Sequence, residues 1–250
     1  MCIRDSPPFL NKYSKSSRSP AVTKSATIYF PLWLSYAAGV LDKKGYDLML
    51  IDGPARCISK EACLEEIKVF DPDFIVIDTS TASINSDLAY TKTIKEVLPN
   101  VKTCLVGTHV SATVKEILPK CANYVDFIAR HEYDYTLPEI AQVIEGKMSL
   151  ADVKGVSYCE NGELKETPNR EYIRNLDELP FVSEVYKKYL NYKDYFYAHV
   201  NFPTISIFSS RGCPSKCFYC MYSQVMFGKG YRKRSAKNLF DAVSYTHLRA

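Results

Sequence analysis

Three cysteines in the last part of the sequence are spaced closely enough to bind one metal group. Cys213, Cys217 and Cys220 form a C-x3-C-x2-C pattern within the stretch SRGCPSKCFYC. Thiolates are the ligands of iron-sulfur clusters, and a tight loop can bring three of them to three corners of one cubane. The fourth iron then has no protein ligand and can chelate a substrate. The spacing therefore predicts a 4Fe-4S cluster on this loop.

Two other uses of these thiols stay open. Zinc usually takes four ligands with paired C-x2-C spacing, and no further cysteine follows Cys220. A redox pair of Cys217 and Cys220 has suitable spacing but leaves Cys213 without a role. The scattered cysteines are expected to be small buried or half-buried side chains, namely Cys57, Cys63, Cys104, Cys121 and Cys159.

The chain before this loop must supply the elements that position it. It alternates regularly between short apolar runs and amphipathic stretches. Short apolar runs predict buried parallel strands at residues 46–52, 73–78, 101–106 and 124–129. Apolar residues at helical spacing predict helices at residues 31–44, 60–70, 84–98, 113–118 and 137–145. This alternation is typical of an α/β fold with a doubly wound parallel sheet, covered by helices on both faces.

The carboxyl ends of the predicted strands form the edge at which such sheets bind small ligands. This edge carries small residues, among them Thr79 and Ser80 after one strand and Gly107 after the next. Small side chains let a bulky ligand approach the backbone. Glu132 and Asp134 follow the last strand, and we expect them to be solvated loop acids.

The alternation stops near residue 150, and the chain continues in a different pattern. Residues 155–167 predict a hairpin that turns at Asn161 and Gly162. Residues 204–209 predict a buried strand that opens a second unit. The predicted parts are an α/β domain, a hairpin with a connector, and the start of a second domain, at residues 7–150, 151–203 and 204–242.

Both ends of the sequence look foreign to the protein. Residues 1–6 (MCIRDS) and 243–250 (VSYTHLRA) resemble peptides translated from sequencing-adaptor sequence. We expect both segments to lie outside the fold, which removes Cys2 and His247 from functional arguments. Ordinary frayed termini would have the same consequence.

Composition and charge exclude several classes of protein. The 46% hydrophobic content of the 250 residues argues against disorder, and no apolar run reaches the ~18 residues of a membrane span. Nine cysteines without a signal-peptide pattern indicate a reducing, cytoplasmic environment. From Arg211 onward, eight Lys and Arg residues face a single acid. This basic segment and its aromatic residues leave a nucleic-acid binder open, with a solvated basic surface as the alternative.

The cysteine motif resembles that of the radical S-adenosylmethionine superfamily, in which an aromatic residue precedes the last cysteine, as Tyr219 does here. The resemblance implies that the cluster binds the amino and carboxylate groups of S-adenosylmethionine at its open iron. One electron then cleaves the sulfonium and releases a 5'-deoxyadenosyl radical. It also implies that Tyr219 lies near the adenine, and that the strand before the loop is the first of a partial (β/α) barrel.

An α/β domain followed by such a barrel resembles the cobalamin (B12)-binding subgroup of this superfamily, over nearly all of residues 7–242. Residues 106–111 (VGTHVS) resemble the subgroup's Gly-Gly-Pro-His segment. The resemblance implies that cobalamin binds at the predicted edge, against Thr79, Ser80, Gly107, Thr108 and His109. His109 can equally be a hydrogen-bonded loop histidine.

Two departures from the subgroup matter. Its opening strand should precede Pro7 and Pro8, where MCIRDS stands, so we expect the sheet to lack an authentic first strand. The Asp-x-His-x-x-Gly motif is absent, because Asp52 is followed by Gly53 and Pro54. Cobalamin would then lack that histidine as its lower axial ligand.

The function implied is that of an enzyme acting on a small molecule. S-adenosylmethionine would supply the radical, and cobalamin would carry a methyl group or tune the reaction. Methyl transfer and ring formation both stay open, on an unknown substrate for which we favour a hydrophobic or tetrapyrrole compound. An electron donor such as flavodoxin or ferredoxin is expected. The sequence ends after one barrel strand and about one helix, so we expect an N-terminal fragment that is inactive alone. A zinc-binding or nucleic-acid-binding module is the alternative.

Overall fold

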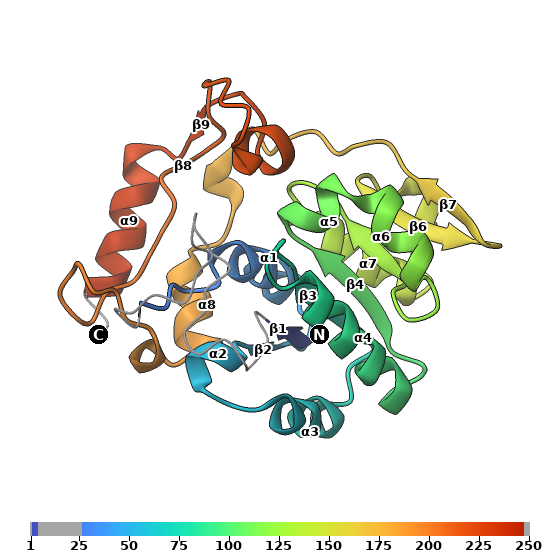
Figure 1. Cartoon of the computed structure of the whole chain (residues 1–250). Helices are drawn as coiled ribbons and strands as arrows, with labels where there is room; N and C mark the ends of the chain where they lie inside the picture. The colour runs from blue at the N-terminus through green and yellow to red at the C-terminus, as the bar shows by residue number, and fades with distance from the viewer. Residues whose placement is uncertain (1, 5–26, 248–250) are drawn as a thin grey trace.

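The fold is built on one sheet with the strand order β2-β1-β3-β4-β5-β6-β7 (Figure 1). The computed structural model describes residues 2–4 and 27–247. The strands are β1 (Cys2–Arg4), β2 (Met49–Ile51), β3 (Phe74–Asp78), β4 (Lys102–Val106), β5 (Phe127–Ala129), β6 (Val156–Glu160) and β7 (Glu163–Glu166). β1 to β5 pair in parallel, and the β6–β7 hairpin extends the sheet antiparallel beside β5.

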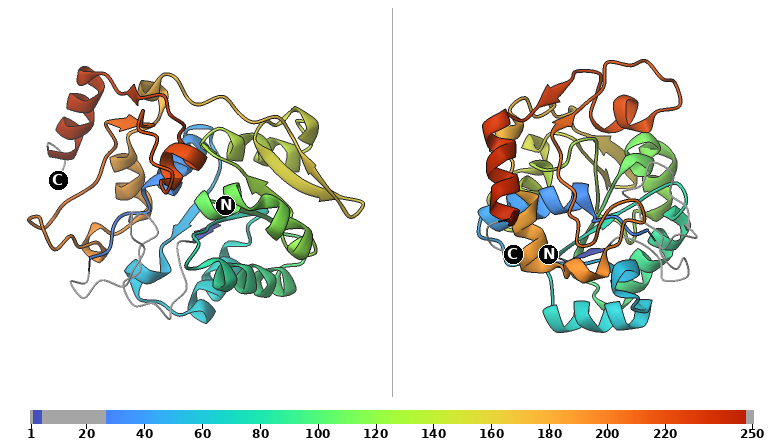
Figure 2. Two further views of the ribbon diagram at one scale, coloured as in Figure 1. Left: turned by 45° about the horizontal axis from the view of Figure 1, so that its top comes forward. Right: turned by 90° about the vertical axis from the view of Figure 1, so that its left-hand side faces the viewer.

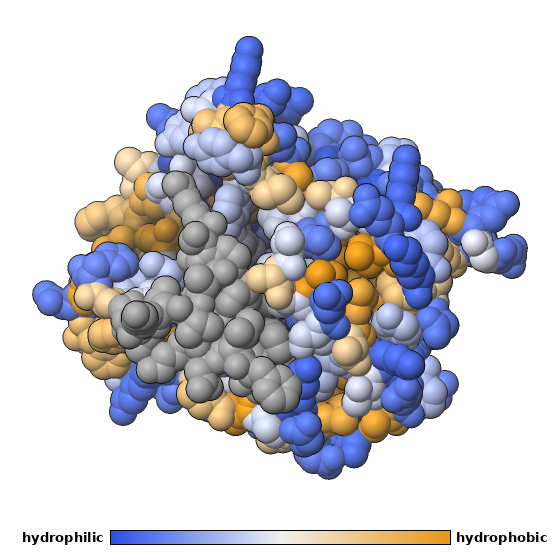
Figure 3. Space-filling model, in the orientation of Figure 1, coloured by the Kyte–Doolittle hydropathy of each residue, from blue (hydrophilic) through white to orange (hydrophobic). Residues whose placement is uncertain are grey.

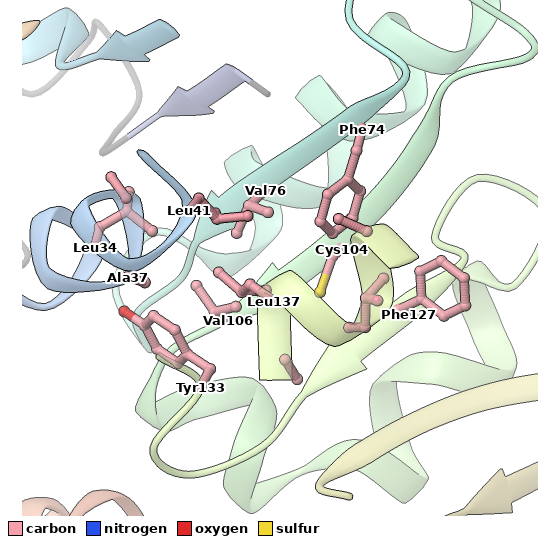
Figure 4. Close-up of a cluster of buried hydrophobic side chains, with 14 of the residues drawn as sticks. Leu34, Ala37, Leu41, Phe74, Val76, Cys104, Val106, Phe127, Tyr133 and Leu137 are labelled. Carbon is pink, nitrogen blue, oxygen red and sulfur yellow. The ribbon is translucent and has the colours of Figure 1, made fainter. Parts of the chain in front are cut away.

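Helices cover both faces of this sheet because its strands are apolar on both sides. Phe74 and Val76 of β3 pack in the cluster that contains α1 (Leu32–Lys43) and α7 (Thr136–Ile144), which Figure 4 shows from within. Ile75 and Ile77 pack in the cluster on the opposite face. That face is covered by α3 (Lys60–Phe70), α4 (Ile84–Val97), α5 (Thr108–Ala112) and α6 (Val114–Cys121) (Figure 2).

The predicted α/β class and doubly wound sheet are therefore confirmed. The strands and helices predicted between residues 31 and 145 are present with boundaries shifted by a few residues at most, and α3 spans the predicted residues 60–70. The hairpin turns at Asn161 and Gly162, as predicted. The order β2-β1-β3-β4-β5 reverses direction between β1 and β3, which is where sheets of this kind bind their ligands.

The opening segment of the chain differs from the prediction. We expected residues 1–6 to lie outside the fold, but Cys2–Arg4 form β1, in which Cys2 pairs with both Met49 and Ile75. The position between β2 and β3 offers unpaired backbone groups on both sides, and a short extended segment satisfies them whatever its side chains are. Pro7 and Pro8 lie outside the described residues.

The connector contains a helix that the sequence did not predict, α8 (Val182–Tyr189). It packs against α1, and Phe30 stacks between Tyr186 and Tyr195 with ring centroids 4.1 and 3.9 Å away. Short 3₁₀ turns occupy Leu150–Asp152, Leu176–Glu178 and Tyr192–Asp194. These three aromatic residues belong to a third apolar cluster, which packs the connector against α1.

The second unit differs more from its prediction. The expected buried strand at residues 204–209 has no strand structure and is partly exposed. A strand needs a neighbour to pair with, and in the described part of the chain only two short strands, β8 (Ser210–Arg211) and β9 (Arg232–Lys233), pair in this unit. The helix α9 (Ala236–His247) continues past residue 242, into the segment expected to lie outside the fold.

No helix in residues 27–247 combines the length and the apolar character needed to cross a bilayer.

Candidate functional site

Thr79 ties the turn after β3 to the end of β4. Its backbone N–H and its hydroxyl both donate to the carbonyl of Val106, at 2.8 and 2.7 Å. The side chain is buried. The hydroxyl thus has a partner inside the protein, and a contact with a ligand stays a prediction.

Ser80 belongs to a short chain of hydrogen bonds that leads into α4. Its Oγ lies 3.0 Å from the Oγ of Ser83, which donates to Asp87 Oδ2 at 2.6 Å. All three residues are buried. These bonds fix the loop after β3, so this part of the edge has a defined shape.

Gly107 is required where β4 ends, for a reason that lies within the protein. Its φ is +110°, and a Cβ added there would lie 2.3 Å from the Thr79 carbonyl oxygen and 2.7 Å from Asp78 Oδ1. The sequence predicted a small residue here because a macrocycle could approach. The observed cause is the close approach of the neighbouring loop, which any side chain would push away.

His109 and Thr108 form the first turn of α5, directly after Gly107, and both are half-buried. The Nδ1 of His109 lies 3.1 Å from the hydroxyl of Thr81. Burial lowers the pKa of His109, although the charges of Glu116 and Asp87 oppose this shift. The imidazole is therefore neutral at pH 7, with both a donor and an acceptor nitrogen for hydrogen bonds.

The three predicted cluster ligands lie on one loop between β8 and the π-helix Tyr222–Met226. Cys213 is exposed, Cys217 and Cys220 are half-buried, and none of the three forms a disulfide. The amide of Cys220 donates to the carbonyl of Cys217 at 3.1 Å, and the Gln224 side chain donates to the same carbonyl at 2.7 Å. The loop therefore has local order around the second and third cysteines.

The loop does not bring the three thiols together. Among residues 2–4 and 27–247, no three Cys, His, Asp or Glu side chains lie close enough to hold a metal ion. Three thiols within one short loop still form a donor set suited to an iron-sulfur cluster, if the loop closes around it. The assignment of Cys213, Cys217 and Cys220 as cluster ligands stays a prediction.

The aromatic residues of the loop point outward. Tyr219 is 77% exposed and Phe218 is 89% exposed, and their rings meet edge to face at 5.7 Å. Figure 3 shows a small apolar group among hydrophilic side chains at the top of the view, over the segment between β8 and β9. Both rings are thus accessible to a ligand, as the expected role of Tyr219 requires.

Most of the other cysteines are buried, as predicted. Cys63, Cys104 and Cys121 lie in the apolar clusters, and burial raises the pKa of Cys121 to about 11. Cys159 is half-buried, whereas Cys57 is exposed. Thiols held protonated by burial are poor metal ligands, so the loop cysteines are the stronger donors.

Comparisons with known proteins bear on both the edge and the loop. An uncharacterized methyltransferase of Pyrococcus horikoshii is 30% identical, over 87% of this chain and 46% of the relative. The anaerobic magnesium-protoporphyrin IX monomethyl ester cyclase of Cereibacter sphaeroides is 28% identical, over 85% of this chain and 34% of the relative. The solved structure of the cobalamin-dependent S-adenosylmethionine radical enzyme OxsB superposes with a TM-score of 0.69 at 16% identity, over 88% of this chain and 30% of that one.

The family model described as the B12 binding domain matches residues 18–141. The chain contains a B12-binding domain and shares its fold with cobalamin-dependent S-adenosylmethionine radical enzymes. It spans less than half the length of the curated relatives named above. The matched residues contain β2 to β5 and the helices from α1 into α7, and the cluster loop lies outside them.

The acids after β5 of the B12-binding domain were predicted wrongly as solvated. Glu132 and Asp134 are 2% and 3% exposed, and both bind the guanidinium of Arg211. The local pattern shows only a loop after a strand, because the partner arginine comes 77 residues later. An arginine directly before a cysteine loop, together with paired acids after a strand, is the signal that could have found this contact.

The basic segment is not a uniform solvated surface either. Arg232 and Arg234 bind within the protein, Arg232 to Glu132 and Arg234 to the carbonyl of Pro180. Lys229 and Lys233 remain exposed. The surplus of positive charge in the sequence thus overstates the charge that a nucleic acid could meet.

Asp52, which opens the motif that this chain lacks, has a structural role. Its Oδ1 accepts from the amide of Ala55 at 3.1 Å and so caps α2 (Gly53–Arg56). Its Oδ2 accepts from the hydroxyl of Tyr195 at 3.0 Å. The carboxylate is thereby buried between the sheet edge and the connector.

Proposed function

We propose that this chain is part of an enzyme that combines a 4Fe-4S cluster, S-adenosylmethionine and cobalamin. The supporting observation is the packing of α5 against the π-helix Tyr222–Met226. α5 begins directly after Gly107, at the carboxyl edge of the B12-binding domain, and the π-helix begins two residues after Cys220. The predicted cobalamin edge and the cluster loop are therefore neighbours, as a reaction that uses both cofactors requires.

The residues of the loop fit the first two cofactors. The thiols of Cys213, Cys217 and Cys220 would hold the cluster and leave one iron open to S-adenosylmethionine, with the exposed ring of Tyr219 beside the adenine. When bound, the cluster supplies the electron that cleaves S-adenosylmethionine.

The edge of the B12-binding domain fits the third cofactor. Gly107, Thr108 and His109 would face the corrin, while Thr79 and Ser80 hold the backbone of the neighbouring loop in place. The neutral imidazole of His109 can donate or accept a hydrogen bond there. Asp52 is engaged with Ala55 and Tyr195, and the residues that follow it offer no axial histidine.

The substrate and the reaction are proposed more coarsely. The relatives named above are a methyltransferase and a ring-forming cyclase, which supports methyl transfer or ring formation on a hydrophobic or tetrapyrrole small molecule. The electron would come from a flavodoxin-like or ferredoxin-like protein in the cytoplasm.

Corrinoid binding tests this proposal. The purified chain is mixed with hydroxocobalamin, desalted, and examined by absorption spectroscopy. We expect wild-type protein to retain the corrinoid and Thr108→Arg to lose it, because the half-buried Thr108 lies at the proposed contact. Thr93→Arg, on the exposed side of α4, is the control and should bind as wild type does. Retention of no corrinoid by the wild type, or equal retention by both variants, would contradict the proposal.

A further inference from the structure

A buried ion pair joins the start of the cluster loop to the B12-binding domain. Arg211 lies two residues before Cys213 and is 3% exposed. Its Nη1 and Nη2 donate to the two carboxylate oxygens of Asp134 at 2.8 and 2.9 Å, and Nη1 also donates to Glu132 at 3.2 Å. A bidentate ion pair of this kind fixes the relative orientation of the two side chains as well as the distance between them.

A second arginine holds the far end of the loop at the same place. Arg232 of β9 donates from Nη1 to both oxygens of Glu132, at 2.9 and 2.8 Å. It also donates to the carbonyls of Ile173 and Phe227, at 2.6 and 2.7 Å. The two arginines thus match two carboxylates, and the network carries no net charge into the interior.

Aromatic rings exclude water from this network. The guanidinium carbon of Arg211 lies 5.3 Å from the ring centroids of Tyr36 and Phe227, and 5.8 Å from that of Trp33. The carboxylates of Asp134 and Glu132 are therefore the polar partners of this buried guanidinium.

The network lies where the two ends of the cluster loop meet. The acids lie in the loop after β5, and the arginines belong to β8 and β9, which pair with each other on either side of the cluster loop. A Cβ on Gly212 would lie 2.0 Å from the carbonyl oxygen of Gly230, so the two ends of the loop touch. The Nδ1 of His131, beside Glu132, lies 2.5 Å from the carbonyl oxygen of Val225 in the π-helix.

We propose that Asp134 and Glu132 are positioning residues that hold both ends of the cluster loop, through Arg211 and Arg232, against the carboxyl edge of the B12-binding domain. The inference rests on the proposed function, since that function makes the loop a cluster site. In this proposal the two acids set the distance and orientation between the cluster and cobalamin without contacting either cofactor.

We call the ion-pair network of Arg211, Arg232, Asp134 and Glu132 the clamp, and trypsin tests it in the cofactor-free chain. Cleavage after position 211 requires its buried side chain to enter the protease, whereas Lys216, five residues later, is exposed. The ratio of the two cleavage rates therefore reports opening of the clamp. We expect this ratio to rise roughly ten-fold in Asp134→Asn and in Arg211→Lys. Arg211→Lys keeps the positive charge but cannot form the bidentate pair of a guanidinium.

Arg56→Lys is the matched control, because Arg56 forms an equally two-pronged pair with Glu66 on an exposed surface. Its ratio should equal that of the wild type. A ratio within about two-fold of wild type in Arg211→Lys would overturn the clamp. If Asp134→Asn fails to fold by circular dichroism, Arg211→Lys alone decides.

Electron paramagnetic resonance of the reduced, reconstituted protein separates positioning from simple stability. We expect the cluster signal to change in Arg211→Lys and to match the wild type in Arg56→Lys. An unchanged signal in a variant whose clamp opens would overturn the positioning role. If no cluster forms even in the wild type, the proposed function fails, whereas the trypsin ratio still tests the clamp itself.

Discussion

The guanidinium of Arg211 meets the carboxylate of Asp134 in a fork-to-fork ion pair, at 2.8 and 2.9 Å, that is almost completely removed from solvent. The two residues are 77 positions apart and come from the two parts of the chain that carry the predicted cofactor sites. Burial of such an ion pair costs a large desolvation free energy, which the attraction between the charges offsets only when the geometry is good. Its position therefore matters more than its contribution to stability.

Removing one partner should be far more damaging than removing both. Asp134→Asn leaves the charge of Arg211 buried without its main partner, and we expect it to lower the free energy of unfolding by about 3–5 kcal/mol. The double variant Asp134→Leu with Arg211→Met should lose less, because Glu132 keeps Arg232. Urea denaturation of the cofactor-free chain measures both. Glu66→Gln, which breaks an exposed pair with Arg56, should cost only ~0–1 kcal/mol. A similarly small cost for Asp134→Asn would refute this account of the pair.

Gly107→Ala tests the close approach at the end of β4. The added Cβ meets the Thr79 carbonyl at 2.3 Å, and the φ of +110° strains any side chain. We expect a loss of unfolding free energy of at least about 2–3 kcal/mol. Gly146→Ala is the control, since Gly146 also has a positive φ, +72°, but no atom within 4 Å of the new Cβ. Equal losses in the two variants would mean that backbone conformation alone, and not the neighbouring loop, requires Gly107.

The lowered pKa of His109 predicts a pH dependence. The unfolded imidazole takes up a proton near pH 6.5, whereas the folded, buried one does so only at lower pH. The unfolded state therefore binds more protons as the pH falls below about 6.5, and stability decreases there. His109→Gln removes this titration, so the urea midpoint of the wild type should fall more between about pH 7.5 and 5.5 than that of the variant. Equal falls would show that His109 does not contribute.

The elements that the sequence predicted well are those fixed by local signals. α3 starts after Ser59, whose side chain caps the helix by accepting from Ala62, and its apolar residues face one side. The missed helix α8 is only eight residues long and is held by contacts with α1, which a local pattern does not contain. Residues 204–209 have the composition of a strand, but strand structure depends on pairing partners elsewhere in the chain.

The candidate site shows the same contrast between residues recognised from local spacing and residues that depend on a distant partner. Spacing along the chain was enough to place Cys213, Cys217 and Cys220 on one loop, whereas their role as cluster ligands stays a prediction. Glu132 and Asp134 were not recognised, because burial of an acid after a strand depends on an arginine far along the chain. Gly107 was predicted to be a cobalamin contact, which stays a prediction, and the structure adds a separate need for glycine in the close approach of Thr79.

Iron and sulfide reconstitution under anaerobic conditions tests the central claim most directly, with iron content and the electron paramagnetic resonance of the reduced protein as readouts. Wild-type chain should acquire about four irons and a 4Fe-4S signal, and Cys217→Ala should lose both. Cys57→Ala, which removes an exposed thiol outside the loop, should behave as wild type does. Full iron loading in Cys217→Ala, or no cluster in the wild type, would contradict the assignment of the loop as a radical S-adenosylmethionine cluster site.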